Sequence, residues 1–108
     1  MCVLGTVARI VTGECGGVLP EAGPLVAEVA MNRWAAGYGF DGWHGIADVA
    51  ADWTIPIAWD AVTRGGDPDG YLFALSADDV HRLQMPPSDW IVRRGRWAIA
   101  AYREWYGE

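Results

Sequence analysis

The sequence predicts an α+β fold, with helices in the N-terminal half and a short antiparallel sheet in the C-terminal half. Up to about residue 64, apolar residues recur at the three- to four-residue spacing of helices. Later segments are short apolar runs of strand length, separated by turn residues. Helices followed by strands, without regular alternation of the two, indicate the α+β class. At 108 residues the chain is long enough for one core, and we expect a single domain over 1–108.

Four helices are predicted before residue 65, each from its apolar spacing and from a residue that starts or stops it. Gly16-Gly17 permits the left-handed backbone that often ends a helix, and Pro24 is a favourable first-turn residue. Gly65-Gly66 stops the last of these helices. The expected bounds are Val3 to Glu14, Pro24 to about Trp34, 46–50 and Pro56 to Arg64.

The C-terminal half predicts a turn, strands and one short helix. Residues 65–70, Gly-Gly-Asp-Pro-Asp-Gly, have turn chemistry, and Tyr71 to Leu75 is an apolar run of strand length. Ser76 with Asp79 three residues later is a helix N-cap pattern for a helix over 77–83. Two further segments form a hairpin, unless the second is a helix through Trp105, and periodicity does not decide between these: they are 90–92 and 97–102.

Composition and charge exclude several classes of partner. The net charge is −6, and the basic residues are eight arginines without a lysine, which argues against nucleic acid as the main partner. No window approaches ~18 uninterrupted apolar residues, so no membrane span is expected. The N-terminus lacks the basic region of a secretory signal. The location therefore stays open between the cytoplasm, another export route and a longer parent protein, and the sequence specifies no oligomeric state.

The cysteines and histidines predict neither a disulfide nor a metal site. If Cys2 and Cys15 both lie on the first helix, they are ~19 Å apart along its axis, too far for a disulfide. We expect both to be small buried apolar residues. His44 and His81 lie far apart, and neither has a metal-ligand spacing with Cys or a carboxylate. No cofactor is expected.

Glu14 is the candidate catalytic residue. It follows Val3, Val7 and Ile10 on one helical stripe, so its side chain is expected to point toward the core or a cleft. Burial and the negative end of the helix dipole would both raise its pKa, which suits a general acid. The alternative is a helix-end glutamate that turns out to water. Two helices packed around Glu14, with a sheet on one side, would form the cleft.

Two stretches resemble a known family. They are Ala-Arg-Ile-Val-Thr-Gly-Glu-Cys-Gly-Gly at 8–17 and Val-Ala-Glu-Val-Ala-Met-Asn-Arg at 26–33, and they resemble the SleB-type cell wall hydrolases, which include the spore cortex-lytic enzymes. In that family an apolar helix ends in Gly-Glu or Ala-Glu, and a Gly-rich loop leads to a helix closing on Asn-Arg. Residues 67–73 are similar to the family's turn before an aromatic strand, and 87–90 to the start of its closing hairpin. The resemblance implies a small lysozyme-like domain.

The resemblance implies cleavage of peptidoglycan glycan strands, of the lytic transglycosylase or muramidase type. Glu14 would protonate the glycosidic oxygen and help the muramyl C6 hydroxyl to close an anhydro ring, so no second carboxylate is obligatory. Ordinary glycosidases need two carboxyl groups, and Asp52 is the best second candidate here. The implied substrate contacts are Trp53, Thr54, Tyr71, Phe73 and Asn32. Arg33, next to Asn32, could also contact substrate, and both could instead cap the helix and anchor a loop. Tyr71 and Phe73 share one strand face, either in the core or in the groove.

The sequence also departs from the family pattern. A second Glu commonly follows the catalytic one by four residues, and that position is Val18 here. A Gln-Phe-Ser-type loop motif is reduced to Ala-Asp-Trp-Thr at 51–54. These departures favour the alternative function, a catalytically inactive glycan- or protein-binding module on the same fold, with a phage- or envelope-associated subunit as one form of it.

Overall fold

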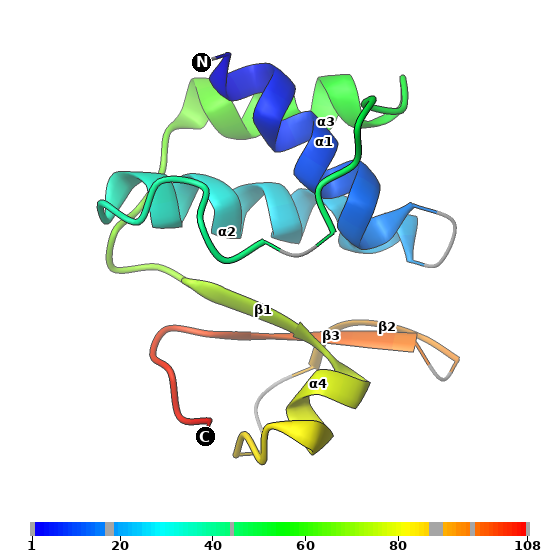
Figure 1. The fold of residues 1–108 in the computed structure, drawn as a ribbon, viewed down its shortest axis with the longest axis vertical. Coiled ribbons are helices and arrows are strands. Elements are labelled where there is room, and N and C mark those ends of the chain that lie inside the picture. The colour runs from blue at the N-terminus through cyan, green and yellow to red at the C-terminus, as the bar shows by residue number, and fades with distance from the viewer. Residues whose placement is uncertain (1, 17–18, 44, 87–89, 96, 108) are drawn as a thin grey trace.

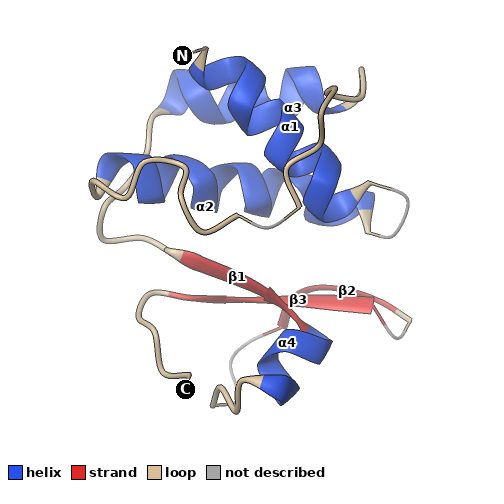
Figure 2. Ribbon diagram, in the orientation of Figure 1, coloured by secondary structure: helices blue, strands red, loops and turns tan. Residues whose placement is uncertain are grey.

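The computed structural model describes residues 2–16, 19–43, 45–86, 90–95 and 97–107, without the side chains of residues 90 and 91. The fold is α+β, as predicted. Three helices lie on one side of a small antiparallel sheet, and the fourth lies on the other side (Figures 1 and 2). The elements in chain order are α1 (Val3–Cys15), the 3₁₀ turn η1 (Pro20–Ala22), α2 (Gly23–Ala35), α3 (Thr54–Arg64), β1 (Phe73–Ser76), α4 (Ala77–Arg82), β2 (Trp90–Arg94) and β3 (Trp97–Tyr102).

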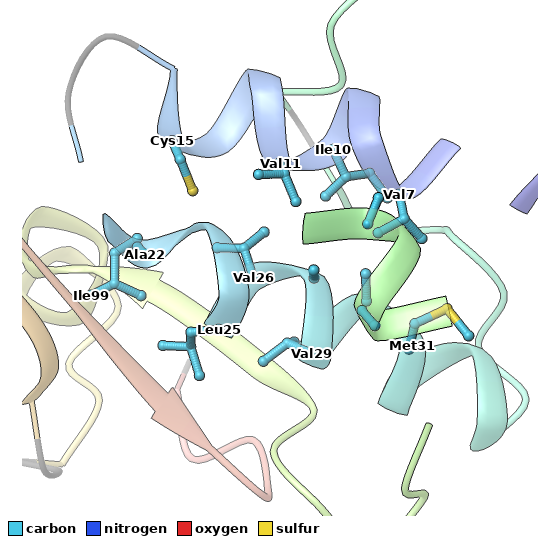
Figure 3. Packing of buried hydrophobic residues seen from close by; sticks show 14 of the residues in the cluster. Val7, Ile10, Val11, Cys15, Ala22, Leu25, Val26, Val29, Met31 and Ile99 are labelled. Atoms are coloured by element: carbon cyan, nitrogen blue, oxygen red, sulfur yellow. The ribbon is translucent and has the colours of Figure 1, made fainter. Parts of the chain in front are cut away.

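The main core lies among α1, α2 and α3. Val7, Val11 and Cys15 recur every four residues on α1 and are fully buried, so they form one continuous stripe against α2 (Figure 3). Val26 and Val29 of α2 face this stripe, and both are also almost wholly buried. Burial of these side chains is the main stabilising contribution of the helical layer.

β3 is the central strand and connects two hydrophobic clusters. The strand order is β1-β3-β2, and both pairings are antiparallel. Ile99 and Ala101 join the helical core, whereas Ala100 and Tyr102 join a second cluster with α4. Alternate side chains of a strand point to opposite faces, so a strand buried on both faces must be apolar throughout. The segment 97–102 is therefore a strand, and the alternative of a helix through Trp105 is wrong.

The N-cap predicted for α4 is confirmed. The Ser76 hydroxyl accepts a hydrogen bond from the Asp79 backbone N–H at 3.2 Å. This bond satisfies one of the amides that the first turn leaves without a helical partner. α4 ends at Arg82, one residue earlier than predicted.

The short helix predicted over 46–50 is absent, and this segment is an irregular strip along α1. Ala47 N–H donates to the Arg9 carbonyl at 3.1 Å, and Ala51 N–H donates to the Thr12 hydroxyl at 3.0 Å. Two of the amides of this stretch thus bond to α1 instead of forming a helix of their own. Val49 is 78% exposed, so the apolar residues of this segment do not form a buried helical face.

Gly13 and Gly45 bring this strip into direct contact with α1. A Cβ added at Gly13 would lie 1.2 Å from the Gly45 carbonyl oxygen, so only glycine fits at that position. Contact between two backbones without intervening side chains fixes the strip beside the end of α1.

Two local predictions at the ends of α1 are wrong. Gly16 has extended backbone (φ −60°, ψ 123°) instead of the left-handed form, and Gly17 lies outside the described residues. Cys2 is exposed, because it precedes the helix and its Sγ accepts a hydrogen bond from Gly5 N–H at 3.3 Å. Cys15 is buried as expected, and both thiols are free.

Within the described part of the chain, no helix has the length and apolar character that a bilayer span requires.

We predict that Gly13→Ala lowers the free energy of unfolding by about 1–3 kcal/mol, because the new Cβ forces the Gly45 carbonyl away from α1. Gly5→Ala is the matched control in the same helix. A Cβ there meets nothing closer than the Cys2 Sγ at 3.5 Å, so this variant should gain about 0.5–1 kcal/mol from helix propensity. Urea unfolding followed by tryptophan fluorescence measures both. Equal effects of the two substitutions would contradict the contact.

We also predict that Cys15 makes stability depend on pH. Burial, and to a smaller extent the charge of Glu14, raise the pKa of the Cys15 thiol from 9.0 to about 12. Between these values the unfolded thiol ionises and the folded one stays protonated. The unfolded state then binds fewer protons, so the free energy of unfolding falls as pH rises. Cys15→Ala should reduce this fall by about 1.4 kcal/mol per pH unit between pH 9.5 and 11. Parallel pH profiles of parent and variant would refute the prediction.

Candidate functional site

Glu14 lies in the last turn of α1 and lines a cavity of about 400 Å³. The cavity is bounded by the ends of α1 and α2, by residues 42–43, by β1 and α4, and by the segment after β3. Its polar groups are two carboxylates and two guanidinium groups, and its walls are aromatic and aliphatic. The lining side chains that carry these properties are Glu14, Asp79, Arg33, Arg82, Trp43, Phe73 and Trp105.

Glu14 points to the cavity and not into the core, the two positions that its place on the α1 stripe left open. The buried stripe of α1 continues from Val11 to Cys15, and Glu14 lies to one side of it and is exposed. The carboxylate is nevertheless held near the irregular strip, since a Cβ added at Gly45 would lie 3.3 Å from Glu14 Oε1. Glu14 is thus an accessible acid at the wall of a cavity.

Asp79 is the second carboxylate of the cavity. The sequence identified it only as part of the N-cap pattern of α4. Its Oδ1 accepts a hydrogen bond from Arg82 Nη2 at 3.2 Å, and both side chains are largely exposed. The docking of α4 across β1 places this pair in the cavity of Glu14. Asp52, the second carboxylate suggested by sequence, is exposed at the other end of the irregular strip and does not line the cavity.

Aromatic rings form much of the remaining wall. The Phe73 and Trp105 rings lie 5.3 Å apart at 58°. The Trp43 Nε1 is buried and has no hydrogen-bond acceptor among the described residues. A second hollow of about 470 Å³ adjoins the first, because Leu72, Phe73 and Trp105 line both. The two hollows therefore share one aromatic wall.

Of the predicted substrate contacts, only Phe73 shares the cavity with Glu14. Tyr71 packs against the helical core, whereas Phe73 packs with the second cluster, so the expectation that they share one face is wrong. β1 begins at Phe73, and strand alternation does not extend back to Tyr71. The Tyr71 ring instead lies against Arg103, whose Cζ is 4.7 Å from its centroid.

Trp53 and Thr54 lie at the start of α3 and do not line the cavity. Thr54 is fully buried, and its hydroxyl donates to the Ala51 carbonyl at 2.6 Å and lies 3.2 Å from the Thr12 hydroxyl. These contacts give Thr54 a structural role, namely to hold the irregular strip between α1 and α3. Trp53 is 38% exposed on a different part of the surface.

Asn32 is buried in the last turns of α2 and binds backbone. Its Oδ1 accepts from Asp67 N–H at 2.7 Å, and its Nδ2 donates to the Tyr71 carbonyl at 3.0 Å. These are the contacts of a loop anchor, the alternative that the sequence left open. By holding residues 67–71, Asn32 positions the following strand, and with it Phe73 at the cavity.

Arg33 follows Asn32 in the Asn-Arg pair, for which the sequence left open substrate contact or loop anchoring. Its guanidinium lines the cavity and donates from Nη1 to the Leu72 carbonyl at 3.0 Å and from Nη2 to the Asp41 carbonyl at 3.2 Å. Burial lowers the pKa of Arg33, and the nearby Tyr38 and Asp41 partly oppose this effect.

No group of three or more His, Cys, Asp or Glu side chains within the described ranges is arranged to hold a metal ion. Comparisons of the chain with protein-family models, with curated proteins and with solved structures find no match.

We predict that Asn32→Ala lowers the free energy of unfolding by about 2–4 kcal/mol, because it leaves the Asp67 N–H and the Tyr71 carbonyl without their partner. Thr63→Ala is the control, since its hydroxyl is exposed and bonds only within α3, and it should change stability by less than about 0.5 kcal/mol. Hydrogen exchange at the Asp67 amide reports the contact directly. Unchanged exchange at that amide in Asn32→Ala would show that Asn32 does not anchor the loop.

Proposed function

We propose that this protein cleaves peptidoglycan glycan strands, with Glu14 as its acid/base. The observation that carries the proposal is that Glu14, at the end of α1, lines one 400 Å³ cavity with Phe73 and Trp105. An accessible carboxyl beside aromatic walls suits a reaction in which a sugar ring is held and its bridging oxygen is protonated. The resemblance of residues 8–17 and 26–33 to the SleB-type hydrolases supports the same function.

The chemistry needs Glu14 in two protonation states. As the acid it gives its proton to the glycosidic oxygen while the bond from that oxygen to the muramyl C1 breaks. As the carboxylate it then takes the proton of the C6 hydroxyl, whose oxygen bonds to C1 and closes the anhydro ring. The proton is returned and no water is consumed, so one carboxyl group is sufficient.

Asp79 adds a second route. A water activated by a second carboxylate would give hydrolysis, and in ordinary glycosidases the two carboxyl groups flank the scissile bond. Asp79 is in the cavity, but it already accepts from Arg82 and belongs to the N-cap region of α4. Its engagement with Arg82 favours the one-carboxylate route.

The second candidate function is a glycan-binding module without catalysis. Two observations favour it. Glu14 is exposed and is not enclosed by the core, and neither Trp53 nor Thr54 lines the cavity. The aromatic walls would serve binding equally well in this case.

Incubation of purified sacculi with the protein tests the proposal. We expect the parent chain to release anhydro-muropeptides, detected by mass spectrometry, and Glu14→Gln to release at least about 100-fold less, since loss of a general acid typically costs 10²–10⁴ in rate. Glu28→Gln is the matched control, because Glu28 lies on α2 and does not line the cavity. It should retain parental activity.

The chemical form of the cleavage products distinguishes the one-carboxylate route from the hydrolytic route. Asp79→Asn should leave the anhydro products unchanged if Glu14 acts alone, and reducing-end products that disappear in Asp79→Asn would assign the hydrolytic route. Co-sedimentation with sacculi without products from any variant would establish the binding module and reject the enzyme.

A further inference from the structure

Arg33 is held in place before any ligand arrives. Besides its two hydrogen bonds to backbone carbonyls, its Cζ lies 4.8 Å from the Tyr38 ring centroid and 5.2 Å from that of Phe73. Gly42 lies close to the guanidinium, since a Cβ there would lie 3.1 Å from Arg33 Nη2. An arginine fixed by rings and carbonyls has already lost most of its rotamer freedom, which makes it a pre-organised binding group.

The Arg33 guanidinium has more N–H donors than its two backbone hydrogen bonds use. A guanidinium has five N–H donors, and the two backbone bonds occupy two of them. Among the described residues no carboxylate lies within ion-pair distance of it, although the charge of Asp41 acts on it from further away. Burial already disfavours its charged form. A partly desolvated cation with unused donors is a site for an anion.

The other charged side chains of the cavity limit which kind of anion can bind there. Arg82 adds a second positive charge, but Glu14 and Asp79 line the same cavity and would repel a highly charged ligand. The net charge of −6 also disfavours polyanions. A single carboxylate on an otherwise neutral ligand satisfies both conditions, because it can pair with the planar guanidinium through two parallel hydrogen bonds.

We propose that Arg33 forms a carboxylate subsite, so that the ligand of this cavity is a glycan carrying an acidic group beside the sugar held at Glu14. This inference rests on the proposed function and adds the substrate's charge to it. In peptidoglycan the carboxylate comes either from the lactyl group of a muramyl residue without peptide or from the peptide stem.

The test measures binding in the Glu14→Gln chain, in which cleavage does not interfere. The ligands are a peptide-free tetrasaccharide of N-acetylglucosamine and N-acetylmuramic acid, the same tetrasaccharide with its lactyl carboxylates converted to primary amides, and a tetrasaccharide bearing peptide stems. Calorimetry or NMR titration gives the three dissociation constants. We expect the amide to bind about tenfold more weakly than the ligand with the recognised carboxylate, the ratio that corresponds to losing a charge-assisted bond.

The relative affinities of the three ligands show which carboxylate of the substrate is bound. Tightest binding of the peptide-free acid supports the lactyl carboxylate, and tightest binding of the stem-bearing ligand supports the peptide. Equal binding of all three overturns the carboxylate subsite and leaves the proposed function standing. Failure of all three to bind overturns both.

The Arg33→Lys variant tests whether Arg33 causes the preference for the acid ligand over the amide. Lysine keeps the charge but lacks the planar fork, so the acid-to-amide ratio should fall to about threefold or less. Arg64→Lys is the control, because Arg64 lies on α3 and pairs with Asp60 on the surface away from the cavity. A purely structural Arg33 would lower stability in Arg33→Lys without changing the ratio. The acid and amide comparison needs no Arg33 variant, so the inference remains testable if that variant does not fold.

Discussion

The attachment of the end of α2 to residues 67–72 is the constraint on which the rest of the structure depends. Asn32 binds the backbone on both sides of the turn, at Asp67 and Tyr71, and Arg33 binds the Leu72 carbonyl. These three hydrogen bonds fix the path of the chain between the helical layer and the sheet. The start of β1, and with it the wall of the cavity, is therefore set by a helix distant in sequence. A buried amide with both of its polar ends engaged is expensive to disturb, so this connection is rigid.

A second attachment fixes the segment beside Glu14. The irregular strip over 45–51 follows α1 through backbone contact at Gly13 and through hydrogen bonds to Arg9 and Thr12. A Cβ added at Gly45 would lie 3.3 Å from Glu14 Oε1, so the strip passes next to this carboxylate. Both attachments use backbone groups, so irregular segments as well as helices and a strand are fixed around the cavity.

The local features of the fold could be predicted from the sequence, and the non-local ones could not. α1 and the N-cap at Ser76 depend on residues within one or two turns, so spacing and capping chemistry located them closely. The segment 46–50 resembles a helix by composition, but its backbone hydrogen bonds go to α1, and nothing in the segment itself reveals this. Spacing placed Glu14 at the end of α1 but not on the exposed side of the buried stripe, because the stripe drifts around the helix from Ile10 to Cys15.

The same distinction applies to the cavity. Phe73 came from a family resemblance, whereas Asp79 and Arg82 reach the cavity only because α4 folds back across the sheet. Their presence depends on a tertiary contact that local sequence does not encode.

The position of β3 has a consequence for the order in which the molecule forms. It is the last described strand in the chain, yet it lies between the other two, which do not pair with each other. β1 pairs with a segment about 25 residues downstream, and β2 pairs with that same segment. The sheet therefore cannot be complete before β3 takes its place between the other two strands. Until that step, Phe73 has no neighbouring strand, and the cavity has only its helical wall.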